Sequence, residues 1–269
     1  MLKRRLLPVL YLLDGWMVRS QEFNEHQYIG DPVQHVERMV DWDVDELIVL
    51  DIGRGEMGFE HHRQDYRHKP VLTLFDFILG ISVECRIPLT IGGRIRSVDD
   101  IRVRIQNGAD KVCVNTLLAD DPEVVNQAAR KFGSQAIVAS IDFRVVDGTS
   151  RVFLDHGGKD SGVGPAEWAR RARELGAGEI LLNAIDRDGM ARGYDLETID
   201  AVAGAVDIPV IACGGAGHQR HFLECFERTR AQAVAAGNIF HFTENAYPRA
   251  KQFLAEKRDD IRPSTALAA

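Results

Sequence analysis

Eight short apolar runs, each followed by a more polar segment, organise this chain. The clearest run is 180–185, which Glu179 precedes and Asp186 and Asp188 follow. A nearly continuous apolar run of this length is typical of a strand buried on both faces, as in a parallel sheet. The predicted strands are 6–12, 46–51, 88–91, 111–114, 136–142, 179–185, 209–213 and 233–236. Segments of helical periodicity, several with Asp, Ser or Pro at their starts, lie at 31–42, 97–107, 122–132, 165–175, 195–206 and 218–227.

Strands and helices that alternate in this way predict an α/β fold, a (β/α)8 TIM barrel with its helices outside. The chain also repeats itself: the pattern around Glu46 recurs around Glu179, and the pair Asp14-Gly15 recurs as Asp147-Gly148. Such a repeat predicts two duplicated half-barrels of four units each. We expect one domain over 1–262 and a frayed tail over 263–269, with 53–70 as a long loop on the active face.

Composition excludes several classes of function. The net charge of −7 gives no basic footprint for nucleic acid or an anionic membrane. Four scattered cysteines lack CxxC spacing, and the N-terminus lacks a signal sequence, so we expect a cytoplasmic protein with reduced thiols. The histidines at 61, 62 and 68 lack the spacing of a metal site. We predict no metal and no cofactor.

Glycine-rich turns after the predicted third and seventh strands indicate phosphate binding. Glycine lets the backbone approach a ligand closely, and a following helix offers unpaired N–H groups to an anion. The loops after strands seven and eight are the usual phosphate site of such barrels. Tight turns between strands and helices need glycine in any case, which is the alternative. The predicted phosphate-binding residues are Gly92, Gly93, Arg94, Asn115 and Thr116 on one side, and Gly189, Gly214, Gly215, Ala236 and Gly237 on the other.

Carboxylates at the C-terminal ends of the predicted strands are candidates for proton transfer. Asp142 is the first choice, because a carboxylate in this position can act as a general acid or base. Asp188 could instead orient the loop beside the phosphate. The internal repeat places Tyr11 where the counterpart of Asp142 is expected. A phenol is a poor base at neutral pH, although it can donate a hydrogen bond.

Four charged residues stand at the opposite ends of the strands. They are Arg5, Glu46, Lys111 and Glu179, two positive and two negative. Charges that enter a barrel are costly unless they pair, so we expect a ring of salt bridges. The ring could be a structural plug, or a gate through which a small neutral molecule enters the barrel axis. The charges alone favour the structural plug, although an apolar plug would cost less, which is the argument for a gate.

The motifs resemble the cyclase subunit of imidazole glycerol phosphate synthase over nearly the whole chain. The matching stretches include 30–32, 45–47, 91–93, 108–112, 132–135, 176–182, 186–189, 193–195, 214–217 and 240–242. The resemblance implies a duplicated barrel that receives ammonia from a glutaminase subunit through its base. It also implies that Arg5, Glu46, Lys111 and Glu179 form the family's charged gate, and that Asp142 is one of two catalytic aspartates.

The chain departs from that family's pattern in three places. The other catalytic aspartate falls at Tyr11, an expected lysine is Leu13, and the third glycine of a phosphate loop is Arg94. These departures resemble a paralogue branch associated with acetamidino modification of surface-polysaccharide sugars. That resemblance implies a subunit that guides ammonia to an ATP-using sugar amidotransferase and binds a phosphorylated or nucleotide-sugar ligand. The alternatives are the histidine-pathway cyclase and a non-catalytic scaffold that activates a glutaminase.

Overall fold

The computed structural model describes residues 3–53, 73–84 and 86–266. Almost all of the predicted loop 53–70, with its three histidines, lies outside the described residues, as does Cys85. Of the predicted frayed tail, 263–266 is described, and the Thr265 hydroxyl donates to Asp43. Among the described residues, no helix is both long and apolar enough to span a bilayer.

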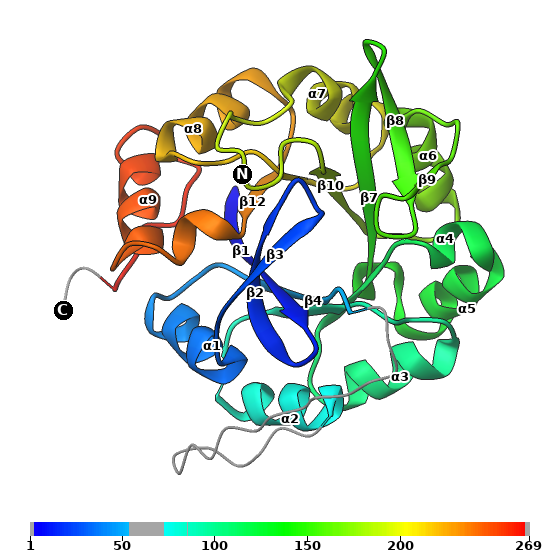
Figure 1. The fold of residues 1–269 in the computed structure, drawn as a ribbon, viewed down its shortest axis with the longest axis horizontal. Helices are drawn as coiled ribbons and strands as arrows, with labels where there is room; N and C mark the ends of the chain where they lie inside the picture. Colours follow the sequence, from blue (N-terminus) through cyan, green and yellow to red (C-terminus); the bar gives the residue numbers. More distant parts are fainter. Residues whose placement is uncertain (1–2, 54–72, 85, 267–269) are drawn as a thin grey trace.

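Eight parallel strands close into a barrel, and helices surround it (Figure 1). Neighbouring strands follow the chain, and the pairing of β10 with β7 completes the circle, with Glu179 beside Val138. The predicted barrel and all eight of its strands are therefore confirmed. The barrel strands are β1 (Arg5–Leu13), β4 (Leu47–Asp51), β5 (Leu89–Gly92), β6 (Lys111–Val114), β7 (Ile137–Val146), β10 (Glu179–Ala184), β11 (Val210–Cys213) and β12 (Ala233–Ala236).

The six predicted helices are all present, and capping defines several of their starts. Asp31 accepts hydrogen bonds from the backbone of Val33 and Gln34, which fixes the start of α1. The sequence analysis missed α2, α4 and α9. The helices are α1 (Pro32–Asp41), α2 (Leu74–Glu84), α3 (Val98–Gln106), α4 (Leu117–Asp120), α5 (Pro122–Phe132), α6 (Pro165–Glu174), α7 (Leu196–Ala205), α8 (Gln219–Arg228) and α9 (Ala246–Ala255), with 3-10 turns η1 (Ser134–Ala136) and η2 (Asn238–Phe240).

Two hairpins extend the barrel strands beyond the mouth, and the sequence analysis did not predict them. β1 continues through Asp14-Gly15 into β2 (Trp16–Gln21) and β3 (Glu25–Gly30), and β7 continues through Asp147-Gly148 into β8 (Thr149–Leu154) and β9 (Lys159–Asp160). Both two-residue turns have positive φ at both positions, 50° and 82° in the first and 49° and 74° in the second. This geometry is that of a type I′ turn, which Asp-Gly favours. The two halves of the barrel therefore begin with the same hairpin.

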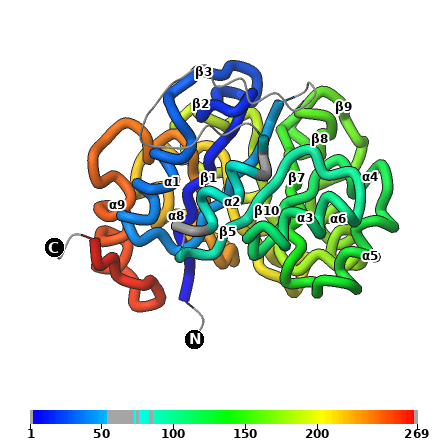
Figure 2. The backbone as a smooth tube through the Cα atoms, turned by 90° about the horizontal axis from the view of Figure 1, so that it is seen from below, coloured from blue at the N-terminus to red at the C-terminus, as the bar shows by residue number. Residues whose placement is uncertain are grey.

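The barrel separates two layers of apolar side chains. The outer layer lies between the strands and the helices, and the inner layer fills the barrel with residues such as Leu7, Ile48 and Leu181. Figure 2 shows the β2–β3 hairpin at the end of the barrel opposite both chain termini. The end that carries the hairpins is the mouth, and the end near the termini is the base.

Candidate functional site

A closed ring of ion pairs lies at the base of the barrel. The Arg5 guanidinium donates to Glu46 and to Glu179. The Lys111 ammonium completes the ring, with Nζ 2.9 Å from Oε2 of Glu46 and 2.8 Å from Oε2 of Glu179. The four residues predicted from their places at the strand starts therefore lie together and pair as expected.

The ring is largely buried, and its charges stabilise one another. Glu46 is 8% exposed and Glu179 is 5% exposed. Burial by itself lowers the pKa of Lys111, but the charges and hydrogen bonds of Glu179 and Glu46 outweigh it and raise that pKa. The same balance raises the pKa of Arg5. Arg5 and Lys111 therefore stay charged at neutral pH.

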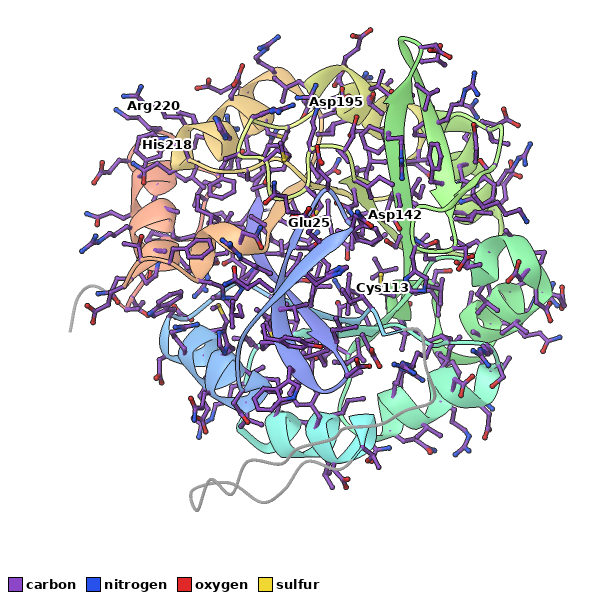
Figure 3. The ribbon with its side chains drawn as sticks, viewed as in Figure 1. Glu25, Cys113, Asp142, Asp195, His218 and Arg220 are labelled. Atoms are coloured by element: carbon purple, nitrogen blue, oxygen red, sulfur yellow. The ribbon has the colours of Figure 1, made fainter. Side chains whose placement is uncertain are left out.

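The described residues enclose two cavities at the mouth. The smaller one, of about 460 Å³, lies over the loops after β10, β11 and β12 and against the β2–β3 hairpin. The larger one, of about 610 Å³, lies over the ends of β4 to β10 and reaches Tyr11 and Cys213. Cys213 lines both cavities. Figure 3 shows Asp142 and Cys113 toward the centre of the barrel. Both residues line the larger cavity.

Asp142 is the best-positioned proton-transfer group of the larger cavity. Its two carboxylate oxygens accept from the amides of Asn115, at 2.8 Å, and Asn183, at 3.1 Å. Burial raises its pKa to about 6, although these two amides oppose the shift. A carboxyl group with this pKa exchanges protons readily near neutral pH.

Tyr11 lies within the inner layer of the barrel, close enough to Asp142 and Asp188 for their charges to act on it. It is 3% exposed, and its ring meets that of Phe23 edge-on at 6.5 Å. Burial raises its pKa well above the ordinary value, and the charges of Asp188 and Asp142 add to the effect. The phenol therefore stays protonated and can only donate or accept a hydrogen bond.

Asp188 is a second buried carboxylate, and it lines the smaller cavity. Burial raises its pKa to about 6. Its Oδ2 accepts from the backbone of Phe23 at 3.4 Å, and its carbonyl oxygen accepts from Glu22 at 2.8 Å. The residue therefore also ties the tip of the β2–β3 hairpin to the β10 loop. Asp186, by contrast, turns toward β7 and accepts from the backbone of Val145 at 3.2 Å.

The predicted phosphate residues divide between the two cavities. Gly189, Gly214, Gly215, Ala236 and Gly237 line the smaller one, and Gly93, Arg94, Asn115 and Thr116 line the larger one. Gly92 lies within β5 and lines neither. At Gly215 φ is +101°, and an added Cβ would lie 2.2 Å from the carbonyl oxygen of Gly193. The β11 loop can pack this closely only with glycine there.

Arg94 forms an ion pair at the rim of the larger cavity. Its Nε lies 2.7 Å from Oδ2 of Asp51, at the end of β4, and its side chain is 15% exposed. The backbone of Arg94 has φ of +53°, a conformation that costs a non-glycine residue about 1 kcal/mol or more. The pair with Asp51 was not predicted from the sequence.

Known relatives match the chain over nearly its full length. A model of the histidine biosynthesis protein family matches residues 5–246. The protein named imidazole glycerol phosphate synthase subunit HisF from Hydrogenobaculum sp. (strain Y04AAS1) is 39% identical over 263 residues, 97% of this chain and 100% of that protein. The subunit of the same name from Alkaliphilus metalliredigens (strain QYMF) is 40% identical, with the same coverage. The chain belongs to this family.

This HisF-family barrel also carries site residues that the sequence analysis missed. Asn183 lies on the inner face of β10, two positions beyond Leu181 and four beyond Glu179. The period of two along the strand could have revealed it. Asn238 holds the β2 strand in place, with its amide donating to the Ser20 carbonyl at 2.7 Å. Among the described residues, no cluster of metal-ligating side chains is present.

Proposed function

We propose that this HisF-family chain is the ammonia-conducting barrel subunit of a glutamine-dependent system. The ring of Arg5, Glu46, Lys111 and Glu179 carries the proposal. Apolar residues would close the base at a lower desolvation cost than four buried charges do. A ring closed by ion pairs between side chains can open for a small polar molecule when those pairs separate.

The partner that supplies ammonia would be a glutaminase subunit docked at the base. Ammonia that passes the ring would enter the inner apolar layer and leave at the mouth. There it would reach Asp142, which is 5% exposed. We place this work in the cytoplasm, where phosphorylated intermediates are made.

The name of the relatives supports one use of the ammonia, the cyclase reaction of imidazole glycerol phosphate synthase. In this reading a bisphosphorylated ribulosyl precursor spans the mouth, with one phosphate on each set of glycine-rich loops. Asp142 and Asp188, both with a pKa raised to about 6, would exchange protons with the substrate. Tyr11 would contribute a hydrogen bond.

A second use is favoured by Tyr11 and Arg94. Tyr11 stands in β1 where the resemblance places a catalytic carboxylate, and Arg94 stands where it places a glycine of one phosphate loop, while the base ring is kept. In this reading the barrel delivers ammonia to an ATP-dependent sugar amidotransferase. That partner would convert an acetamido group to an acetamidino group on a nucleotide-activated sugar of a surface polysaccharide.

Turnover of the bisphosphorylated histidine-pathway precursor with excess ammonium separates the two uses. Activity of the unaltered chain at an ordinary enzymatic rate supports the cyclase. No activity in the unaltered chain, with activity gained in Tyr11→Asp, supports delivery to another enzyme. The first outcome excludes the second use, and the second outcome excludes the first.

Substitutions in the base ring test whether the barrel conducts ammonia or is only a scaffold that activates a glutaminase. Glu46→Leu or Lys111→Leu should leave glutamine hydrolysis in the complex intact while product formation from glutamine falls. Product formation from added ammonium should persist, because ammonium can reach the mouth from solution. Unaltered coupling between hydrolysis and product formation would favour the scaffold.

A further inference from the structure

The side chain of Tyr11 reaches across the mouth from its own strand toward two others. Tyr11 stands in β1, and its hydroxyl lies within hydrogen-bonding reach of the Cys213 thiol at the end of β11. A Cβ added at Gly237, directly after β12, would lie 3.4 Å from Cε2 of Tyr11. The phenol ring therefore extends from β1 past the β12 loop to β11, against two residues that line the smaller cavity.

Phe23, at the tip of the β2–β3 hairpin, continues the barrier that Tyr11 begins. The two rings meet edge-on, with their centroids 6.5 Å apart. The backbone N–H of Phe23 donates to Oδ2 of Asp188, 3.4 Å away, which holds the tip against the β10 loop. A Cβ added at Gly157, in the turn between β8 and β9, would lie 3.8 Å from Cδ1 of Phe23. The barrier of Tyr11 and Phe23 therefore runs from the barrel strands up to both hairpins.

This barrier falls between the two cavities. Within the part of the chain that the structure describes, Cys213 is the one residue that lines both, and it is the residue that the Tyr11 hydroxyl approaches. On the hairpin, Gln21 and Glu25 line the smaller cavity, whereas Phe23 lines the larger one. The tip of the hairpin thus has one cavity on each side.

Each cavity has its own buried carboxylate and its own glycine-rich loops. Asp188 lines the smaller cavity and Asp142 the larger one. Arg19 is the single arginine or lysine among the described residues that line the smaller cavity, and its guanidinium lies 5.3 Å from the centroid of the Phe242 ring. A guanidinium that stacks on a ring can still offer its N–H donors to a phosphate. With a volume of about 460 Å³, the smaller cavity can hold a small ligand by itself.

We propose that Tyr11 and Phe23 divide the mouth into two separate ligand sites and exclude a ligand that would span both. The smaller site takes a small molecule with a single phosphate, held by the glycine-rich loops after β11 and β12 and by Arg19. A side chain as short as that of aspartate could not reach β11 from position 11, so this position sets the length of the ligand. The inference rests on the phosphate binding of the proposed function, and it disfavours a bisphosphate laid across the mouth.

The test is calorimetric titration of the full-length chain with inorganic phosphate and with the bisphosphorylated histidine-pathway precursor. The unaltered chain should bind the two with similar affinity, because only one phosphate of the precursor can be seated at a time. In Tyr11→Ala the two cavities join and both phosphates can be seated. The precursor should then bind about a hundredfold more tightly than it binds the unaltered chain, while the affinity for inorganic phosphate stays nearly unchanged.

Two further variants separate the parts of the barrier. Tyr11→Phe keeps the ring and removes only the hydroxyl, so it is the matched control and should exclude the precursor as the unaltered chain does. Phe23→Ala shortens the barrier at the hairpin, where the side chain is half-buried and its loss is no threat to the barrel core. This variant should bind the precursor more tightly than the unaltered chain and less tightly than Tyr11→Ala.

Four results would overturn the proposal. One is an unaltered chain that binds the precursor about a hundredfold more tightly than inorganic phosphate, as a ligand seated at both ends would. The others are an unchanged ratio of the two affinities in both Tyr11→Ala and Phe23→Ala, a gain in Tyr11→Phe equal to that in Tyr11→Ala, and no binding of inorganic phosphate to any variant. The titrations use neither ammonia nor a glutaminase. Any of these failures therefore leaves conduction through the ring standing, and a failed ring test leaves this binding result standing.

Discussion

Removing Lys111 from the base ring should destabilise the fold more than an exposed ion pair can. In Lys111→Met, Oε2 of Glu46 and Oε2 of Glu179 lose the ammonium 2.9 and 2.8 Å away. The two carboxylates then share the single positive charge of Arg5. Breaking a buried ion pair from one side costs about 3–5 kcal/mol, and we take about 3 because the Lys111 side chain is 20% exposed. For a chain of this size, that corresponds to a fall of about 6–12 °C in the unfolding temperature.

The assay is thermal unfolding monitored by circular dichroism. It compares the unaltered chain, the single variants Lys111→Met and Glu179→Gln, and the double variant Lys111→Met/Glu179→Gln. The double variant removes one charge of each sign and leaves Arg5 paired with Glu46, so it should recover at least half of the loss. The control Arg173→Met breaks an exposed pair with Asp207 and should not shift the transition measurably. A Lys111→Met protein that unfolds within 2 °C of the unaltered chain, or effects that simply add in the double variant, would refute the reasoning.

The pH dependence of this difference has a definite sign. Burial opposes the ammonium form of Lys111, but Glu179 and Glu46 outweigh it and raise the pKa above the ordinary value of 10.5. A group whose folded pKa is raised contributes its full stability below its unfolded pKa and loses it as the pH rises through the folded pKa. The gap between the unaltered chain and Lys111→Met should therefore stay constant from pH 6 to 9 and shrink above about pH 10.5.

Two further predictions concern the mouth. Gly215→Ala should lower the thermal unfolding temperature by more than Gly148→Ala does. Both glycines have positive φ, but an added Cβ at 215 would meet the carbonyl oxygen of Gly193, whereas one at 148 would meet nothing within 4 Å. If the two variants unfold alike, close packing does not explain Gly215. Burial raises the pKa of Asp142 and of Asp188 from 3.8 to about 6, so each is less stable in the folded state once ionised. Asp142→Asn and Asp188→Asn should therefore raise the unfolding temperature above about pH 6 and have no such effect below about pH 4, and the opposite trend would contradict the raised pKa values.

The barrel could be predicted because the pattern of apolar and polar positions differs clearly between its strands and its helices. The run before Asp186 is apolar at every position except Asn183, and its strand ends at Ala184, one residue before the predicted end. β3 escaped prediction because it lies over the mouth with Glu25 to Tyr28 exposed, so its sequence lacks an apolar period. α9 also escaped, since Pro248 interrupts its first turn.

The sequence could predict those site residues whose positions follow from the ends of strands. It could not predict contacts that depend on the orientation of a side chain. The base ring follows from charges at four strand starts, because parallel strands bring their starts to one end of the barrel. The pairing of Arg94 with Asp51 depends on the conformation of a turn. The hydrogen bond from Asn183 to Asp142 depends on the orientation of the Asn183 amide. Neither contact has a signature in the order of residues along the chain.

The charges of the base ring make the two halves of this duplicated chain unequal. Arg5, Glu46 and Lys111 come from the first half, and Glu179 comes from the second. The first half alone would bury an excess cation at its base, and the second half alone would bury an excess anion. Each half therefore supplies the counterion of the other, which favours association of a first-half fragment with a second-half fragment over pairing of either fragment with itself.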